Sequence, residues 1–212
     1  MLFRSGKRGN MKDFIPDSYN ALRNCVQLHL SGGGNWDCMP EDVASVPFED
    51  LHCVFACPVD LGEKGADAYL LVRENALREW NVRPEQICLD ALRNSVLQLP
   101  ACMQNLSELL GEKSDDPMNM FVLSNKEMRY GASAALYPGV LEKIAAKMED
   151  DLLLLPSSVH EFIVMPRRGN DPEAMRTIVR EVNRLEVPDN EILSDSVYLY
   201  RRGERIFSIC RD

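Results

Sequence analysis

Residues 118–166 constrain the fold of this chain more than any other stretch, because a strand, a loop and a helix can be located in it one after another. Met120–Ser124 is a short apolar run that ends at Asn125 and a polar loop, which is typical of a buried strand. Beyond Pro138, apolar residues recur at helical spacing up to Met148, with charged residues between them. This pattern predicts an amphipathic helix that lies on a sheet.

Paired apolar runs predict hairpins. The runs at 152–155 and 162–165 flank a polar turn at 156–158, and both arms are apolar enough to be at least half buried. Further hairpins are predicted for residues 51–59 with 68–72 and for residues 197–200 with 205–209, and helices for residues 74–80, 83–99 and 171–187. Because hairpins replace regular strand–helix–strand alternation, the sequence predicts an α+β fold: a mixed, mainly antiparallel sheet built of hairpins, with helices packed mostly on one face.

The N-terminal part has weaker patterns. Residues 1–45 are predicted to be a variable extension that is partly disordered, and residues 46–212 a single α+β domain. The first 12 residues carry four basic side chains and no acidic one, which is typical of a disordered tail. Residues 17–30 can be interpreted as a helix or, from their alternation near the end, as a strand. The glycines at 32–34 predict a turn or hinge.

Composition limits the classes of partner. The formal net charge of −9 argues against binding to nucleic acids or anionic membranes, since both require a basic face. No apolar run approaches the roughly 20 residues that cross a bilayer. The seven cysteines are an odd number without framework spacing, which favours reduced thiols in a cytoplasmic protein. We therefore expect a soluble cytoplasmic protein without direct binding to nucleic acid or membrane.

The loop after the central strand contains the first group of candidate binding residues, Asn125, Tyr130, Gly131 and Tyr137. They lie between the strand exit and the helix start, where side chains and helix N–H groups can meet a ligand or a partner's loop. Hydrogen bonds that lock the loop are the alternative interpretation.

The second group lies at the predicted hairpin turn and consists of Ser157, Ser158, His160 and Glu161. A nucleophile–base arrangement would have His160 deprotonate a serine while Glu161 orients the imidazole. However, adjacent residues on a strand point to opposite faces, and no nucleophile elbow accompanies them. The alternative is a turn whose serines bond the backbone and whose histidine ties two loops together.

Metal and cofactor sites are not expected. Cys53 and Cys57 fall on one face of a predicted strand beside His52, but four residues of strand span about 13 Å, which is too far for one shared zinc. Buried thiols are the better interpretation. There is no paired Cys-x-x-Cys motif and no cofactor loop, so we predict no cofactor and no metal.

Several short segments together resemble a known family. They are Val46-Pro-Phe-Glu-Asp-Leu51, Met120-Phe-Val-Leu-Ser-Asn125, Tyr130-Gly-Ala132, Leu136-Tyr-Pro-Gly-Val-Leu141, Leu155-Pro-Ser-Ser-Val-His-Glu161 and Leu193-Ser-Asp195. In order and spacing they resemble an uncharacterised bacterial domain-of-unknown-function family of gut anaerobes. The resemblance covers about residues 46–200, leaves the family's N-terminal part unmatched, and implies no activity.

These observations favour a non-catalytic intracellular module that binds or regulates a protein partner through the loops at 125–137 and 157–161. One alternative is a hydrolase-like enzyme that uses His160 and Glu161 with a nearby serine. A second is an acidic mimic of nucleic acid, which would require the acids at 149–151, 115–116 and 36–50 to share one face.

Overall fold

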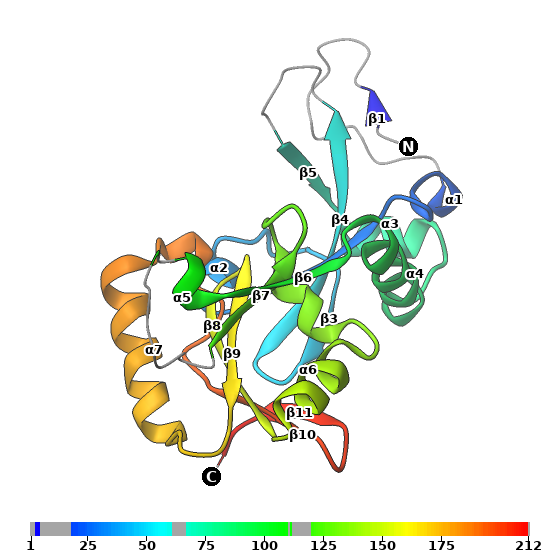
Figure 1. Ribbon diagram of the computed structural model, residues 1–212. Helices are drawn as coiled ribbons and strands as arrows, with labels where there is room; N and C mark the ends of the chain where they lie inside the picture. Colours follow the sequence, from blue (N-terminus) through cyan, green and yellow to red (C-terminus); the bar gives the residue numbers. More distant parts are fainter. Residues whose placement is uncertain (1–2, 5–17, 61–66, 110, 112–119, 212) are drawn as a thin grey trace.

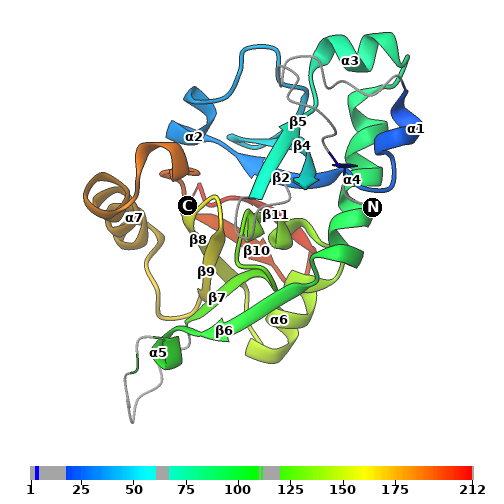
Figure 2. The ribbon, with the colours of Figure 1, turned by 90° about the horizontal axis from the view of Figure 1, so that it is seen from above.

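The computed structural model describes residues 3–4, 18–60, 67–109, 111 and 120–211. Its strands form two sheets that follow each other along the chain. Figure 2 shows the first sheet, in blue and cyan, in one half of the molecule and the second, in green to red, in the other half.

The first sheet is built around one long strand, β4 (Leu51–Asp60). Its first half lies between β2 (Gln27–Ser31) and β3 (Ser45–Phe48), which both pair with it in antiparallel orientation. Its second half pairs with antiparallel β5 (Asp67–Leu71) and with the short parallel strand β1 (Phe3–Arg4). A single strand therefore holds this sheet together, and Figure 1 shows it projecting upward from the body of the molecule.

The second sheet has the strand order β11-β10-β8-β9-β7-β6, and all neighbours are antiparallel. Its strands are β6 (Ala101–Asn105), β7 (Phe121–Asn125), β8 (Leu152–Ser158), β9 (Glu161–Pro166), β10 (Tyr198–Arg201) and β11 (Ile206–Ile209). The leucine run of β8 is buried on both faces: Leu152 and Leu154 belong to the main core, whereas Leu153 and Leu155 pack in a second cluster. This explains why the run is continuous instead of alternating.

The helices are α1 (Tyr19–Leu22), α2 (Gly33–Asp37), α3 (Glu74–Glu79), α4 (Pro84–Gln98), α5 (Leu106–Leu109), α6 (Val140–Met148) and α7 (Pro172–Glu186), with 3-10 turns η2 (Gly131–Leu136) and η3 (Asp189–Glu191). Helix α4 packs on β2 and β4, and α7 packs on β8. The two long helices lie on opposite sides of the molecule (Figures 1 and 2). Asp171 caps α7 by accepting hydrogen bonds from two of its first amides. None of the helices in the described ranges is long and apolar enough to cross a membrane.

The predicted α+β class with largely antiparallel hairpins is confirmed, but the strands form two sheets instead of one. Residues 27–31, which the sequence placed in the N-terminal extension, pair with β4. The predicted turn at 156–158 is wrong, since β8 continues to Ser158 and the turn follows it. The strand at 101–105 was not predicted. Most of the predicted tail lies outside the described residues.

The glycines at 32–34 do not form a hinge; two of them open the short helix α2. A Cβ on Gly32 would come within 2.5 Å of the Leu193 carbonyl oxygen, and one on Gly34 would overlap the carbonyl of Asp189. These glycines therefore serve the close approach of α2 to the segment around η3.

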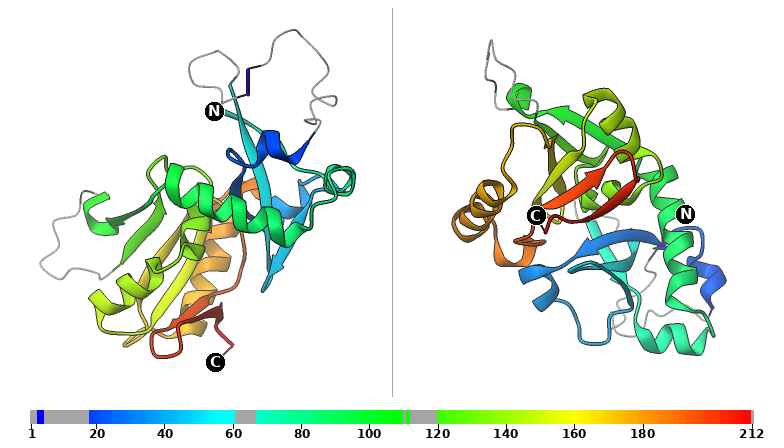
Figure 3. Two further views of the ribbon diagram at one scale, coloured as in Figure 1. Left: turned by 90° about the vertical axis from the view of Figure 1, so that its right-hand side faces the viewer. Right: turned by 90° about the horizontal axis from the view of Figure 1, so that it is seen from below.

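Asp50, directly before β4, fastens the first sheet to the second. Its carboxylate accepts hydrogen bonds from the hydroxyls of Ser194 (2.7 Å), Ser196 (2.8 Å) and Tyr198. Burial, with the bond to Asp50, raises the pKa of Tyr198. In Figure 3 the first sheet and the hairpin of β10 and β11 lie next to each other. We call this contact the Asp50 clasp.

Candidate functional site

The loop of residues 126–129 is organised by one buried side chain, Asn125 at the end of β7. Its Nδ2 donates to the Arg129 carbonyl (2.8 Å), and its Oδ1 accepts from the amides of Glu127 (3.0 Å) and Arg129 (3.4 Å). The asparagine side chain thus supplies hydrogen bonds to backbone groups that no longer have a partner strand. All four loop side chains are exposed, so a fixed backbone presents them to solvent.

His160 ties this loop to the turn between β8 and β9. The Tyr130 amide donates to Nδ1 of His160 (2.9 Å), so Nδ1 carries no proton and the neutral ring has its proton on Nε2. Nε2 lies 3.8 Å from the Glu191 carboxylate, beyond hydrogen-bond distance. Tyr130 has left-handed backbone angles, with φ of 49°.

Four rings meet beside this contact and come from both sheets. Tyr130 stacks on His29 of β2, with centroids 4.3 Å apart and planes at 7°. Tyr69 of β5 meets His29 and Tyr130 edge-on, at 4.8 and 5.2 Å, and His160 lies 5.3 Å from Tyr130. We call this set the four-ring cluster. The ring distances and angles are those of favourable aromatic packing. Through these contacts the cluster joins the loop to the first sheet.

His29 is only 3% exposed, and its Nε2 has no hydrogen-bond partner among the described residues. Burial, with a smaller contribution from nearby His160, lowers the pKa of His29 to about 3. It is therefore neutral at physiological pH and acts as a flat packing surface.

Gly131 lies where three segments converge. A Cβ there would overlap the Ser124 hydroxyl and come within 2.6 Å of the Asn125 nitrogen and 2.7 Å of the His160 carbonyl oxygen. The Ser124 hydroxyl also donates to that carbonyl (2.8 Å). Glycine is thus required for close approach of the strand end and the turn.

The serines at the end of β8 make local contacts. Ser157 donates to the Glu161 carboxylate (3.4 Å), and the Ser158 hydroxyl accepts from the His160 amide (3.0 Å). Within the described ranges no hydroxyl is hydrogen-bonded to the His160 ring. The arrangement matches the interpretation of a turn in which the histidine ties two loops together.

Tyr137 lies apart from these groups: it is buried in the main core at the end of η2, and burial raises its pKa. The structure therefore brings together Asn125, Tyr130, Gly131 and His160, with the two serines and Glu161 on the neighbouring turn. Sequence reasoning missed His29, Tyr69 and Glu191, which come from distant segments. One signal was available for His29. Polar residues alternate with Val26, Leu28 and Leu30 in this segment, which places His29 on the polar face of a strand.

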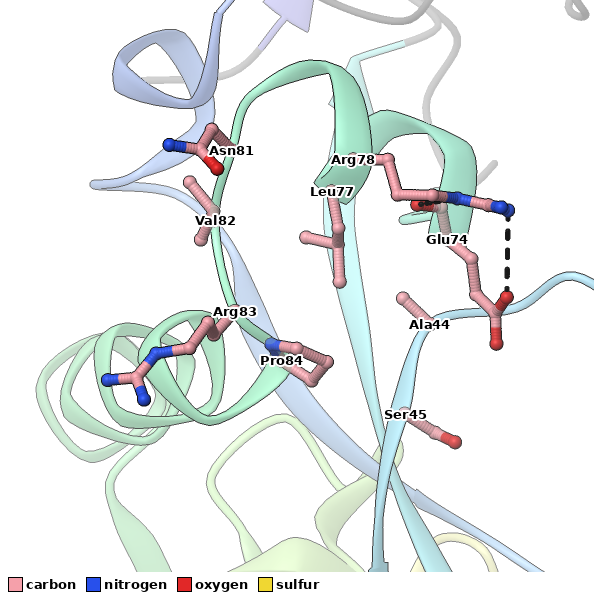
Figure 4. Close-up of a pocket in the computed structure, with 9 residues that line it drawn as sticks. All are labelled: Ala44, Ser45, Glu74, Leu77, Arg78, Asn81, Val82, Arg83 and Pro84. Carbon is pink, nitrogen blue, oxygen red and sulfur yellow. Dashed lines mark hydrogen bonds and ion pairs between the residues drawn. The ribbon is translucent and has the colours of Figure 1, made fainter.

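A separate cavity of about 470 Å³ lies between α3, the start of α4 and β3. Leu77, Val82 and Pro84 contribute apolar surface, and Arg78 and Arg83 carry the positive charge (Figure 4). The full lining is Ala44, Ser45, Glu74, Leu77, Arg78, Asn81, Val82, Arg83 and Pro84. Arg78 is paired with Glu74 at 3.7 Å. None of the residues singled out from the sequence lines this cavity, and it contains no nucleophile–base pair.

The acidic side chains that could bind a metal or mimic nucleic acid are described next. No group of three or more histidine, cysteine or acidic side chains could hold a metal in the part of the chain that the structure describes. Asp50, Asp150 and Asp151 accept hydrogen bonds from hydroxyls or backbone amides. Residues 115–116 lie outside the described residues.

The fold and site define an α+β protein with two consecutive sheets and a histidine-locked surface loop. The chain belongs to a family of unknown function, DUF5688, whose model matches residues 18–202. The match begins at residue 18, whereas the resemblance recognised in the sequence began at about residue 46. The family therefore includes part of the predicted N-terminal extension. No curated protein and no solved structure matches this chain.

Proposed function

We propose that this chain is a non-catalytic intracellular module that binds or regulates a protein partner through the 126–129 loop and the adjoining turn at 157–161. The observation that carries the proposal is the rigid presentation of four exposed side chains by one buried asparagine. A loop that is already ordered loses little conformational entropy on binding.

The anchoring of the loop supports this proposal. Besides the bonds of Asn125, the Met128 amide donates to the Asn125 carbonyl (3.0 Å) and the Lys126 amide to the Pro100 carbonyl (3.1 Å). Tyr130 is fixed by His160 and by its stacking on His29. The start of the loop is thus held next to β6, and its end is held by contacts with both sheets, as expected for a recognition loop on a rigid scaffold.

The side chains of the loop suit a protein partner better than a small molecule. Lys126, Glu127, Met128 and Arg129 are all exposed and offer charges of both signs next to a flexible thioether. Methionine and arginine are enriched in protein interfaces. The cavity of Figure 4 is lined by other residues.

The hydrolase alternative is less well supported by the same geometry. A histidine base must reach a hydroxyl with an unprotonated nitrogen, but Nδ1 of His160 is occupied by the Tyr130 amide. The other nitrogen faces Glu191 and not a serine. We therefore assign His160 a positioning role.

The test is capture of partners from a lysate of the source cells with three forms of the intact chain. The loop variant carries Lys126→Ala, Met128→Ala and Arg129→Ala, which leaves Asn125 and its bonds in place. The matched control carries Arg180→Ala, Glu181→Ala and Arg184→Ala on the exposed side of α7. All three forms must show the same thermal unfolding.

We expect one protein to be recovered in near-stoichiometric amount by the unaltered chain and the α7 control but not by the loop variant. Calorimetric titration with that purified protein should then rank the three forms in the same way. The unaltered chain and the α7 control should bind with similar affinity, and the loop variant more weakly. If the loop variant binds the partner as well as the α7 control does, the loop is not the binding surface.

A further inference from the structure

The His160 imidazole has a different neighbour at each of its two ring nitrogens. The Tyr130 amide donates to Nδ1 at 2.9 Å, and we call this bond the His160 tie. Nε2 lies 3.8 Å from the Glu191 carboxylate, which is too long for a hydrogen bond but close enough for attraction between opposite charges. The tie exists only while Nδ1 carries no proton.

Backbone contacts hold both neighbours beside the ring. The Val159 amide donates to the Glu191 carbonyl (2.9 Å), and the Glu191 amide donates to the Pro188 carbonyl (2.8 Å). The amide of His160 itself donates to the Ser158 hydroxyl (3.0 Å). Because these backbones are fixed, a change of charge on the ring is enough to change which neighbour the ring binds.

The titratable groups around His160 respond to acid in different ways. The nearby carboxylates are Glu191 in η3 and Glu161 in β9, and the second already accepts a hydrogen bond from a hydroxyl of β8 (3.4 Å). Burial, with a smaller contribution from His160, lowers the pKa of His29 to about 3, and burial raises the pKa of Tyr69. His29 and Tyr69 therefore keep their charge between about pH 8 and about pH 5, the range in which histidine side chains ordinarily gain a proton.

Protonation changes what His160 can bind. A charged imidazole carries a proton on both nitrogens, so Nδ1 becomes a donor that faces a second donor, the Tyr130 amide. Nε2 then belongs to a cation beside the Glu191 carboxylate, and charge-assisted hydrogen bonds of this kind are about 2.7–2.9 Å long. The two nitrogens point away from each other on the ring, so a movement toward Glu191 takes Nδ1 away from the Tyr130 amide.

We propose that the His160 tie is a pH-sensitive switch of the 126–129 loop. The neutral ring holds the Tyr130 amide and with it the end of the loop. The charged ring binds Glu191 and releases that amide, while the start of the loop stays bonded to the Asn125 side chain. Tyr130 has a left-handed backbone with φ of 49°, which is uncommon for a residue with a side chain, so its backbone relaxes once the tie is lost.

Only the consequence for binding rests on the proposed function. If the loop binds a partner, it should bind more weakly at about pH 5 than at about pH 8. The opening of the tie is a property of this chain alone and is measured without a partner. Failure of the switch and failure of the binding proposal can therefore be told apart.

The test is nuclear magnetic resonance of the intact, isotope-labelled protein, followed from about pH 8 to about pH 5. Imidazole spectra identify the protonation state of His160, and hydrogen exchange gives the protection of the Tyr130 amide relative to an unfolded chain. We expect His160 to change from the form with one proton on Nε2 to the doubly protonated form. The protection of the Tyr130 amide should fall about tenfold with the same midpoint, the size expected for one lost backbone hydrogen bond.

Three variants make the result specific. His160→Asn places an uncharged amide oxygen close to the position of Nδ1, so the Tyr130 amide should stay protected over the whole pH range. Glu191→Gln removes the attracting charge and should move the midpoint to lower pH. His52→Gln changes the third histidine of the chain, whose ring stacks on Trp36, and should leave the midpoint unchanged.

The proposal is overturned if the Tyr130 amide of the unaltered protein is equally protected at both ends of the pH range. It is also overturned if the amide loses protection in His160→Asn as it does in the unaltered protein. Glu191→Gln provides a separate measurement should the His160 variant not fold, and an unchanged midpoint in it would contradict the proposed movement of the ring.

Discussion

The two sheets bury different kinds of side chain. In the second sheet, β8 is buried through its leucine run, and Phe162 and Tyr198 fill the space beside it. In the first sheet all five residues of β2 are buried, and three of them, Gln27, His29 and Ser31, are polar. The strand β8 thus has an aliphatic interior, whereas β2 has a mixed one.

This difference bears on how much each sheet contributes to the stability of the fold. Among the described residues, the buried atoms without hydrogen-bond partners include Oε1 of Gln27, Nε2 of His29 and Nδ1 of His52, all in the first sheet. Each such atom costs about 1–3 kcal/mol. Natural proteins usually satisfy buried polar groups, so three such atoms in one sheet lower its contribution to stability. We therefore expect the second sheet to contribute more to stability than the first.

The largest effect is therefore expected in the second sheet. Phe162 is fully buried and meets the rings of Tyr198 (5.7 Å) and Phe207 (6.3 Å) nearly at right angles. Phe162→Ala should lower the free energy of unfolding by about 4 kcal/mol. Urea denaturation measures this, and Leu97→Ala, at an exposed position of α4, should change it little. A cost below that of the Asn125 variant described next would contradict the expected order of these two effects.

A smaller effect is expected at the loop that joins the sheets. Asn125→Ala removes one donor and one acceptor that satisfy three backbone groups, and should cost about 2 kcal/mol. Amide hydrogen exchange at Glu127 and Arg129 should accelerate as well. Asn105→Ala, which removes a similar but more exposed contact to the Ser107 amide, should cost about 1 kcal/mol. Equal losses at both asparagines would mean that Asn125 has no special role.

Acid should weaken the first sheet through His29. Its folded pKa of about 3 lies below the ordinary value of 6.5, so the unfolded chain binds a proton first as the pH falls. Stability from this residue is complete above the ordinary value and decreases through the window down to about pH 3, by about 1 kcal/mol per pH unit. Urea unfolding of the unaltered chain and of His29→Phe between about pH 7 and about pH 5 measures the difference. Parallel curves would contradict a neutral buried His29.

The smallest effect is that of His29→Phe at neutral pH. Phenylalanine keeps a ring for stacking on Tyr130 and removes the unpartnered Nε2, which is favourable. Its larger ring must fit the same packed position, which is unfavourable. We expect the two effects nearly to cancel, so that stability changes by less than about 1 kcal/mol. Thermal unfolding provides the measurement. A loss of the size expected for Phe162→Ala would show that the imidazole has a bonding partner, and the contrast between the sheets would then weaken.

The sequence predicted the parts of the fold that local patterns determine. Helices α4, α6 and α7 and the three hairpins follow from apolar periodicity within each segment. Two sheets in place of one could not be predicted, because strand pairing such as that of β2 with β4 depends on distant residues. At the site, the loop around Asn125 and the role of His160 as a tie were anticipated. His29, Tyr69 and Glu191 were not, since nothing in their local sequence indicates which rings or charges they will meet.

The Asp50 clasp also sets an order in time. Asp50 and Ser194 are 144 positions apart, whereas the strands that pair with β4 all come from residues 3–71. On a ribosome, the first sheet can assemble while its carboxylate is still surrounded by water, because its pairings are comparatively local. The hydroxyls of Ser194, Ser196 and Tyr198 replace that water only when the segment that carries them has been synthesised. The clasp can therefore form only after the hairpin of β10 and β11 has been synthesised, and it requires both sheets to be in place.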